Sequence, residues 1–507
     1  MTTRVTILPD DPIGTIAPEL HGQFAEHLGE LIYPGIWVGE GSAEPNIDGI
    51  RTDVVEALKP LQIPVLRWPG GCFADMYHWR DGIGDRSERP GRLNVHWGME
   101  PEPNQVGTHE FIAFTRAIGA EPYFAGNVGS GEVSELADWI EYCNQPAGSS
   151  LAAERAANGA AEPFGVQWWG IGNENWGCGG RMTPEYYAEL YSRFRNYAYA
   201  YGDTAIKAVA CGPNAMDWSW TERFFDRIGP TRIGQVGYFA AHYYCGTAGT
   251  ATQFDDSQWL ELLTRAVAVE GIITGHRELM DAVDPDRKVG LLLDEWGTWH
   301  PVEPGKPAGG LYQQNTMRDA LVAGLTLDLF HTHADKLAMA NIAQLINVLQ
   351  AMLLVDQTRV VKTPTYHAFA MHAGHRGATA VRLESDAPVI SNGEKSVDWV
   401  KSCWRDGRAT ELKQVAGSAS VYGDALTVTL TNADPRSGAE VSVELRGGDW
   451  SQVTAEVLAA DDVHAHNTFD DPEVVAGPVP LAAAVSQGAL RLDLPPASVI
   501  KVTGVRA

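Results

Sequence analysis

Residues 166–175, VQWWGIGNEN, form an apolar run with the composition of a buried β-strand, and the run leads into a carboxylate, Glu174. Residues 289–297, VGLLLDEWG, repeat this pattern and lead into Asp294 and Glu295. Parallel strands that helices cover on both faces have such short apolar sequences. In an α/β barrel the C-terminal ends of the strands surround the mouth, where active sites lie. The two runs therefore predict a barrel with two carboxylates that face each other across its mouth.

The same alternation of short apolar runs and amphipathic stretches continues over the first three quarters of the chain. Helical periodicity recurs between the strand candidates, for example over residues 184–201 and 315–331. Eight strands that alternate with helices predict a (β/α)8 barrel, the TIM-barrel fold, over residues 17–378. The predicted strands are Leu20–Ala25, Val65–Pro69, Pro122–Val128, Val166–Gly172, Ala205–Cys211, Val236–Tyr243, Val289–Asp294 and Leu337–Ala343.

The pattern changes after about residue 380, where short β runs follow one another between turn residues. This pattern is typical of a β-sandwich, here of jelly-roll-like type, over residues 379–507. Residues 1–16 also contain a strand pattern, and we expect that strand to join the sandwich. The predicted sandwich strands are Pro388–Ile390, Ala419–Tyr422, Leu426–Thr431, Val441–Leu445, Thr454–Leu458, Leu490–Leu494 and Ser498–Val502.

Length, charge and cysteine content limit the class of protein. A chain of 507 residues has room for one large and one smaller domain. Its net charge of −26 would repel nucleic acid and anionic membranes, so neither is expected as a partner. The first residues lack the pattern of a signal peptide, and no apolar run is long enough to span a membrane. These features predict a cytoplasmic protein whose six scattered cysteines are reduced thiols.

Polar residues follow seven of the eight predicted strands. Active sites of barrel enzymes lie at this face, and the recurrence at seven strand ends indicates one shared site. These residues are Glu26 and His27, Arg67, Asn127, Asn173 and Glu174, His242 to Tyr244, Glu295, and Asn341 to Gln344.

Two glutamates at a barrel mouth suit the hydrolysis of a glycosidic bond. One carboxylic acid must protonate the leaving oxygen, which requires a pKa raised by burial or by a nearby negative charge. A second carboxylate, kept ionised by polar neighbours, serves the anomeric carbon. Trp176 and Trp299 could wall such a site, because sugar C–H faces stack on indole rings.

The motifs around these residues resemble those of the family 51 glycoside hydrolases, in particular the bacterial intracellular α-L-arabinofuranosidases. The matching segments run in order over essentially the whole chain. They are HGQFAEHLG (21–29), LRWPGGCFAD (66–75), HWRDGIG (78–84), NENWGCGG (173–180), DEWGTW (294–299), MANIAQ (339–344) and NTF (467–469).

This resemblance implies a role for each matching residue. Glu174 would be the acid/base, Glu295 the nucleophile, and Arg67 and His242 would support the two carboxylates. The residues implied to bind the furanose ring or to line the pocket are Glu26, Cys72, Trp97, Asn173, Tyr244, Trp299 and Gln344.

The resemblance also implies an activity. We expect an exo-acting, retaining α-L-arabinofuranosidase that releases terminal non-reducing arabinofuranose from arabino-oligosaccharides by double displacement, with no metal or organic cofactor. It further implies a homo-oligomer, a trimer or a hexamer.

Other interpretations are open at this point. The same barrel could act on another furanoside or as an endo-β-glucanase, or it could bind carbohydrate without turnover. His21, His27 and His242 could be metal ligands, although their spacing matches no strong metal motif. The glycines of residues 177–180 could hold a phosphate, but the GxxxxGK pattern is absent.

Overall fold

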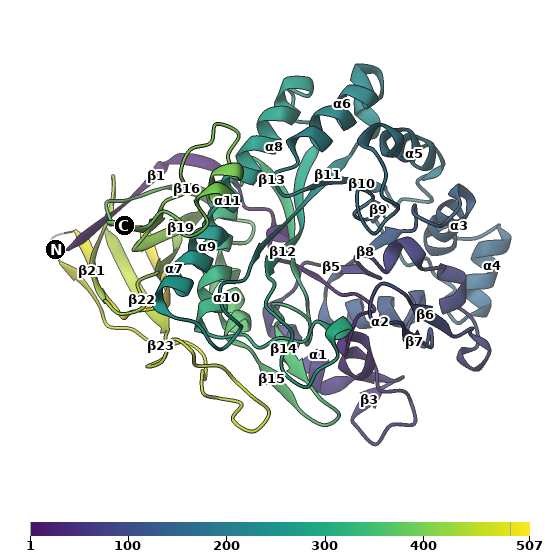
Figure 1. Cartoon of the computed structure of the whole chain (residues 1–507), viewed down its shortest axis with the longest axis horizontal. Coiled ribbons are helices and arrows are strands. Elements are labelled where there is room, and N and C mark those ends of the chain that lie inside the picture. Colours follow the sequence, from purple (N-terminus) through teal and green to yellow (C-terminus); the bar gives the residue numbers. More distant parts are fainter. Residues whose placement is uncertain (1, 487, 507) are drawn as a thin grey trace.

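The computed structural model describes residues 2–486 and 488–506, and it places a barrel beside a C-terminal sheet (Figure 1). Eight parallel strands close the barrel in the order β10-β11-β12-β13-β2-β5-β8-β9. They are β2 (Gly22–Phe24), β5 (Val65–Trp68), β8 (Glu121–Gly126), β9 (Trp168–Ile171), β10 (Lys207–Asn214), β11 (Tyr238–Gly246), β12 (Gly290–Thr298) and β13 (Leu337–Ala343). Each observed strand overlaps the predicted one, so the predicted (β/α)8 barrel is confirmed.

Strand ends position the two glutamates differently. Strand β9 ends at Ile171, and Glu174 lies in the loop that follows it. Strand β12 continues to Thr298, so Glu295 lies inside a strand that is longer than predicted. In the parallel register of β11 and β12, Glu295 is the partner of His242. This register brings the histidine beside the carboxylate.

Helices cover the outside of the barrel, and several of them begin at a residue whose side chain caps the helix. Helix α5, for example, has Pro184 in its first turn, and the Thr183 hydroxyl accepts a hydrogen bond from the Tyr186 amide. No helix in the described part of the chain is long and apolar enough to cross a membrane. The helices are α1 (Thr52–Leu58), α2 (Thr108–Ile118), α3 (Val133–Asn144), α4 (Ser150–Ala157), α5 (Pro184–Tyr197), α6 (Trp218–Arg232), α7 (Asp256–Val267), α8 (Val269–Val283), α9 (Met317–Thr332) and α10 (Pro364–His372).

The C-terminal domain is a ten-stranded sheet with a hydrophobic core of its own, in the order β23-β22-β26-β20-β19-β16-β1-β21-β25-β24. The N-terminal strand β1 pairs with β16 on one side and with β21 on the other. Both termini lie at this end of the molecule (Figure 1). The strands are β1 (Thr3–Thr15), β16 (Thr379–Ser385), β19 (Val415–Tyr422), β20 (Ala425–Asn432), β21 (Ala439–Leu445), β22 (Trp450–Leu458), β23 (Val479–Pro480), β24 (Ala483–Ser486), β25 (Ala489–Leu494) and β26 (Ser498–Arg506).

One predicted sandwich strand lies outside this sheet. Residues 388–390 overlap β17 (Val389–Ser391), which pairs only with β18 (Leu412–Lys413) among the described strands. The segment turns toward α7, where the Thr264 hydroxyl donates to the Ser391 hydroxyl over 2.8 Å. The division of the chain into residues 1–16, 17–378 and 379–507 stays a prediction.

Helix α9 joins the barrel to the sheet and is buried on almost every side. A helix without a polar face is typical of such an internal position. Its Asp328 accepts hydrogen bonds from the hydroxyls of Ser418, over 2.7 Å, and Thr429. Its His331 lies 2.9 Å from the Ser418 hydroxyl, and His375 lies 2.8 Å from the Ser420 hydroxyl. The contact between the two parts therefore contains a buried polar network.

Candidate active site

Glu295 is fixed at the barrel mouth by residues of two other strands. Arg67 of β5 donates to Glu295 Oε1 over 3.0 Å, and the Tyr244 hydroxyl of β11 donates to Oε2 over 2.8 Å. His242 Nδ1 lies 3.5 Å from Oε2. Arg67 also donates to the side-chain oxygen of Asn173. The predicted supporting residues therefore contact the carboxylate that they were expected to support.

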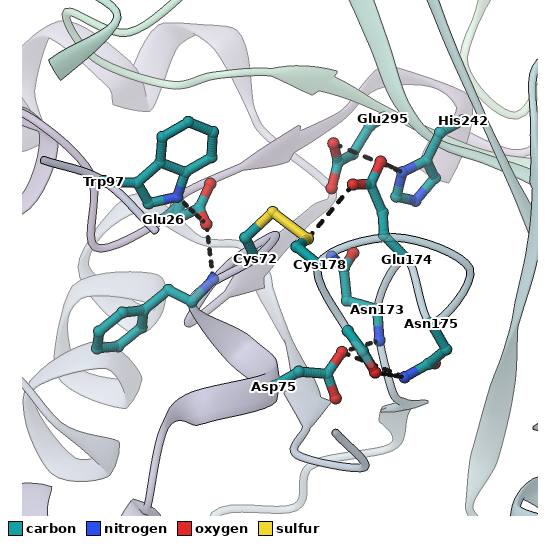
Figure 2. The surroundings of a disulfide bond; sticks show 12 residues. Glu26, Cys72, Asp75, Trp97, Asn173, Glu174, Asn175, Cys178, His242 and Glu295 are labelled. Atoms are coloured by element: carbon teal, nitrogen blue, oxygen red, sulfur yellow. Dashed lines mark hydrogen bonds and ion pairs between the residues drawn. A yellow bond between two sulfur atoms is a disulfide. The ribbon is translucent and has the colours of Figure 1, made fainter. Parts of the chain in front are cut away.

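Glu174 faces the same space from the loop after β9 (Figure 2). His242 Nδ1 lies 2.9 Å from Glu174 Oε1. One carboxylate oxygen of Glu174, one of Glu295 and one ring nitrogen of His242 all lie within 4.8 Å of one another. A single imidazole thus lies between the two carboxylates.

The surroundings drive the pKa values of the two glutamates in opposite directions. Burial raises the pKa of Glu174, and the negative charge of Glu295 adds to this rise against the lowering effect of His242. Burial also acts to raise the pKa of Glu295, but His242, Arg67 and Tyr244 outweigh it and hold that pKa below its usual value. Burial lowers the pKa of His242, yet the two carboxylates outweigh it and raise this pKa overall. The arrangement suits one protonated and one ionised carboxyl group.

A third carboxylate, Glu26, lies on the other side of the mouth (Figure 2). Its Oε1 accepts the indole N–H of Trp97 over 2.9 Å and the amide N–H of Phe73 over 3.0 Å. Its Oε2 accepts from Gln344 over 3.1 Å. Burial, followed by the charge of Glu295, raises the pKa of Glu26 to about 7. Trp97 belongs to the hairpin between β6 (Arg92–Asn94) and β7 (Glu100–Glu102), whose place sequence reasoning could not give.

The two tryptophans expected to wall the site differ in exposure. Trp299 follows β12, is 36% exposed, and packs edge-to-face on Tyr244 with 4.9 Å between ring centroids. Trp176 is partly buried, and its indole N–H donates to the Gly212 carbonyl over 3.1 Å. Trp299 therefore offers an accessible indole surface beside the residue that holds Glu295.

The expectation that all six cysteines are reduced is wrong, because Cys72 and Cys178 form a disulfide bond (Figure 2). The two cysteines are 106 residues apart in the sequence, so their pairing could not be predicted from spacing. They meet because the barrel topology brings the loops after β5 and β9 together. Cys178 Sγ lies 3.6 Å from Glu174 Oε2, a contact without a hydrogen bond since the disulfide sulfur carries no proton. The other four cysteines are free and buried: Cys143, Cys211, Cys245 and Cys403.

The three histidines considered as metal ligands lie apart from one another. His21 lies 3.0 Å from His331, and His27 lies 2.7 Å from Glu102. Two groups in the described residues have donors close enough for a metal ion, namely Glu174 with His242 and Glu295, and Cys72 with Glu174 and Cys178. In the first group the carboxylates already accept hydrogen bonds from Arg67 and Tyr244 and contact His242, so their oxygens are occupied. In the second group both sulfurs belong to the disulfide, so neither is available as a thiolate ligand. The donor sets fit acid–base chemistry better than metal binding.

Sequence reasoning gave no role to Asp75, which the structure places directly beneath the site. Its buried carboxylate accepts hydrogen bonds from the amides of Val128, Gly129 and Asn173. Asp75 follows no predicted strand directly, so the rule that active-site residues lie at strand ends could not identify it. Asn127, which the rule did select, instead accepts the amides of Ser130 and Gly131 and shapes its own turn.

Comparisons with known proteins agree with this geometry. Residues 57–258 match the α-L-arabinofuranosidase 1 domain model, and residues 294–498 match the α-L-arabinofuranosidase C-terminal domain model. An intracellular exo-α-L-arabinofuranosidase of Bacteroides ovatus is 41% identical over 98% of this chain and 95% of its own length.

Solved structures give the same result. The GH51 arabinofuranosidase of Xanthomonas axonopodis pv. citri superposes with a TM-score of 0.93 at 41% identity, covering 99% of both chains. The α-L-arabinofuranosidase of Thermotoga maritima, solved as an arabinose complex, has a TM-score of 0.85 at 28% identity over the whole of both chains. The protein is thus a glycoside hydrolase, and the chain belongs to the α-L-arabinofuranosidases of family 51.

Proposed function

We propose that this protein is an exo-acting, retaining α-L-arabinofuranosidase that removes terminal arabinofuranose from arabino-oligosaccharides. The observation that carries the mechanism is the pair of glutamates with opposite pKa shifts and carboxylate oxygens within 4.8 Å. Retaining enzymes hold their carboxyl groups about 5–5.5 Å apart, whereas inverting enzymes leave about 6.5–9.5 Å for a water molecule. The short separation supports the retaining alternative.

In this mechanism Glu295 attacks the anomeric carbon while Glu174 protonates the leaving oxygen. Arg67 and Tyr244 hold Glu295 in place and lower its pKa, which favours the ionised nucleophile, and burial raises the pKa of Glu174, which favours the protonated acid. Having given its proton to the leaving oxygen, Glu174 is a carboxylate and takes a proton from water, which attacks the anomeric carbon and breaks its ester bond to Glu295. Asn173 Nδ2 and Gln344 Oε1 are buried without a partner among the described residues, which suits hydrogen bonds to sugar hydroxyls.

The exo mode rests on the residues that surround Glu26. Trp97, Gln344 and the Phe73 amide hold this carboxylate at the mouth opposite Glu174. A carboxylate held by these three donors is placed to bind hydroxyls of a terminal ring, which supports exo action. The Bacteroides relative carries the term exo in its name, and the Thermotoga structure is an arabinose complex.

The test is hydrolysis of p-nitrophenyl α-L-arabinofuranoside beside the β-D-galactofuranoside, β-D-xyloside and β-D-glucoside. We expect cleavage of the arabinofuranoside, its loss in Glu295→Ala, and a first-formed product of retained configuration by NMR. Glu174→Ala should lose far more rate on oligosaccharides than on aryl glycosides with good leaving groups, since those need little protonation. If none of the four glycosides is hydrolysed, cleavage of a polymer would favour the endo-acting alternative, and binding of a polymer without cleavage would favour the binding-only alternative.

Location and assembly are further proposals. Cytoplasmic residence is supported by the word intracellular in the name of the Bacteroides relative. A homo-oligomer, trimer or hexamer, rests on the family resemblance alone, and light scattering of the purified protein would test it.

A further inference from the structure

We infer that Asp75 is a positioning residue that holds the backbone of Glu174 in the orientation needed for proton transfer. This inference rests on the proposed acid/base role of Glu174. Asp75 lies in the short helical turn Ala74–Met76 after β5 and is 4% exposed. Its Oδ2 accepts the Asn173 amide over 2.8 Å and the Asn175 side-chain N–H over 3.4 Å. The carboxylate thus holds both neighbours of Glu174 (Figure 2).

The second oxygen of Asp75 ties the same loop to the next strand. Oδ1 accepts the amides of Val128 and Gly129, each over 2.8 Å, in the turn after β8. All four donors are neutral N–H groups, so both side-chain oxygens of residue 75 must act as acceptors. Burial raises the pKa of Asp75 to about 7, and the four donors oppose this rise. An amide at position 75 would turn one acceptor into a donor that faces other donors.

The backbone at Glu174 requires such support. Glu174 has φ of +40°, in the left-handed region that non-glycine residues rarely adopt. Residues in this region persist when the surrounding structure holds them there. Close packing beneath the loop agrees, because a Cβ at Gly179 would lie 2.4 Å from Asp75 Oδ2 and 2.0 Å from the Asn173 carbonyl oxygen. The carboxylate of Asp75 therefore occupies the position from which it can hold the loop.

Substitution of a merely structural carboxylate would lower kcat/KM for all substrates alike. Substitution of a residue that positions the acid would lower it mainly for substrates whose leaving group needs a proton. The experiment measures kcat/KM of Asp75→Asn on a series of aryl α-L-arabinofuranosides with leaving groups from 2,4-dinitrophenol to phenol. We expect a loss of roughly 10- to 100-fold for phenol, part of the ~10²–10⁴-fold that a positioned acid contributes. For 2,4-dinitrophenol we expect a loss of less than about threefold, since its departure needs little protonation.

Asp284→Asn is the matched control. Asp284 is similarly buried, at 3% exposed, and accepts a backbone amide, that of Val289 over 2.7 Å, but it lies before β12 at the opposite end of the barrel. This variant should lose stability without a change in leaving-group dependence. Equal losses on all leaving groups in Asp75→Asn, or no loss at all, would overturn the inference.

Two further variants keep the result decisive. Glu174→Ala is measured on the same series, and if it shows no leaving-group dependence, then the acid/base proposal itself fails, independently of Asp75. If Asp75→Asn does not fold, Asn175→Ala takes its place, because it removes one donor to Asp75 and leaves the carboxylate intact. A smaller loss of the same leaving-group pattern supports the inference, and a uniform loss contradicts it.

Discussion

At the scale of single residues, the site depends on one imidazole between two carboxylates. His242 is protonated more readily than an ordinary histidine, because Glu295 and Glu174 outweigh the effect of burial on its pKa. Its positive charge lowers the pKa of both glutamates. The residue therefore sets both limits of the pH range in which Glu295 is ionised and Glu174 is protonated.

We expect His242→Asn to move both limbs of the pH profile of kcat/KM to higher pH. Activity is lost on the acid side as Glu295 gains a proton, and its pKa rises when His242 is removed. Activity is lost on the basic side as Glu174 gives up its proton, and that pKa rises as well. The rate at the optimum should fall roughly 10- to 100-fold, since a hydrogen bond to a charged group contributes ~1.5–3 kcal/mol. If both limbs of the profile stay where they are in the wild type, this assignment is contradicted. Glu26, whose pKa is about 7, is present in both proteins, so its own titration does not affect the comparison.

At the scale of elements, the loops after β5 and β9 act as one unit. Asp75 of the first loop bonds Asn173 and Asn175 of the second, the disulfide links the two loops, and Arg67 of β5 itself also bonds Asn173. The polar side chains at strand ends could be predicted from the sequence, because the parallel barrel places all such ends at one face. The disulfide and Asp75 could not, because each depends on how two loops of different length meet, which periodicity does not encode.

We expect the double variant Cys72→Ser, Cys178→Ser to be less stable by about 2–4 kcal/mol, the usual effect of a disulfide that closes a long loop. The loop here spans 106 residues. Differential scanning calorimetry with and without a reductant measures the effect. Reductant should lower the melting temperature of the wild type and leave the variant unchanged. A variant as stable as the oxidised wild type would show that the bond does not stabilise the fold.

At the scale of the whole molecule, the barrel and the sheet share a buried polar contact. His21, His331 and His375 are fully buried there, and burial lowers the pKa of each well below the usual value, with neighbouring histidines adding to the effect. The alternation of strands and helices predicted the barrel, and the succession of short β runs predicted the C-terminal sheet domain. These patterns did not predict the contact, because its residues come from five separate segments whose spacing has no period.

We expect acidification to weaken this contact. The folded pKa of each of these histidines lies below the unfolded value, so its contribution to stability is complete above about pH 6.5 and is lost as the pH falls toward the folded value. Each contributes ~1.4 kcal/mol per pH unit to this loss. His375→Gln can still bond Ser420 and Thr429, which lie 2.8 and 3.1 Å from the His375 ring nitrogens.

The measurement for this prediction is the unfolding free energy in urea between pH 7 and pH 5. Below about pH 6 the variant should show a slope that is smaller by about 1.4 kcal/mol per pH unit, the value for one proton, and near pH 7 the two slopes should converge. Arg376, Lys501 and His372 add positive charge near the buried histidines in both proteins, so their effect is common to the comparison. Parallel slopes would rule out His375 as the titrating group.

The place of β1 in the sheet has a consequence for synthesis on the ribosome. This strand, Thr3–Thr15, is synthesised several hundred residues before its partners β16 and β21, which begin at Thr379 and Ala439. At ~5–20 residues per second, the strand waits tens of seconds for them. Throughout that time its hydrogen-bonding edges are unpaired, the condition under which strands associate with the wrong chain. Strand β1 is thus the segment that a chaperone, or the growing barrel itself, must shield until β16 and β21 have been made.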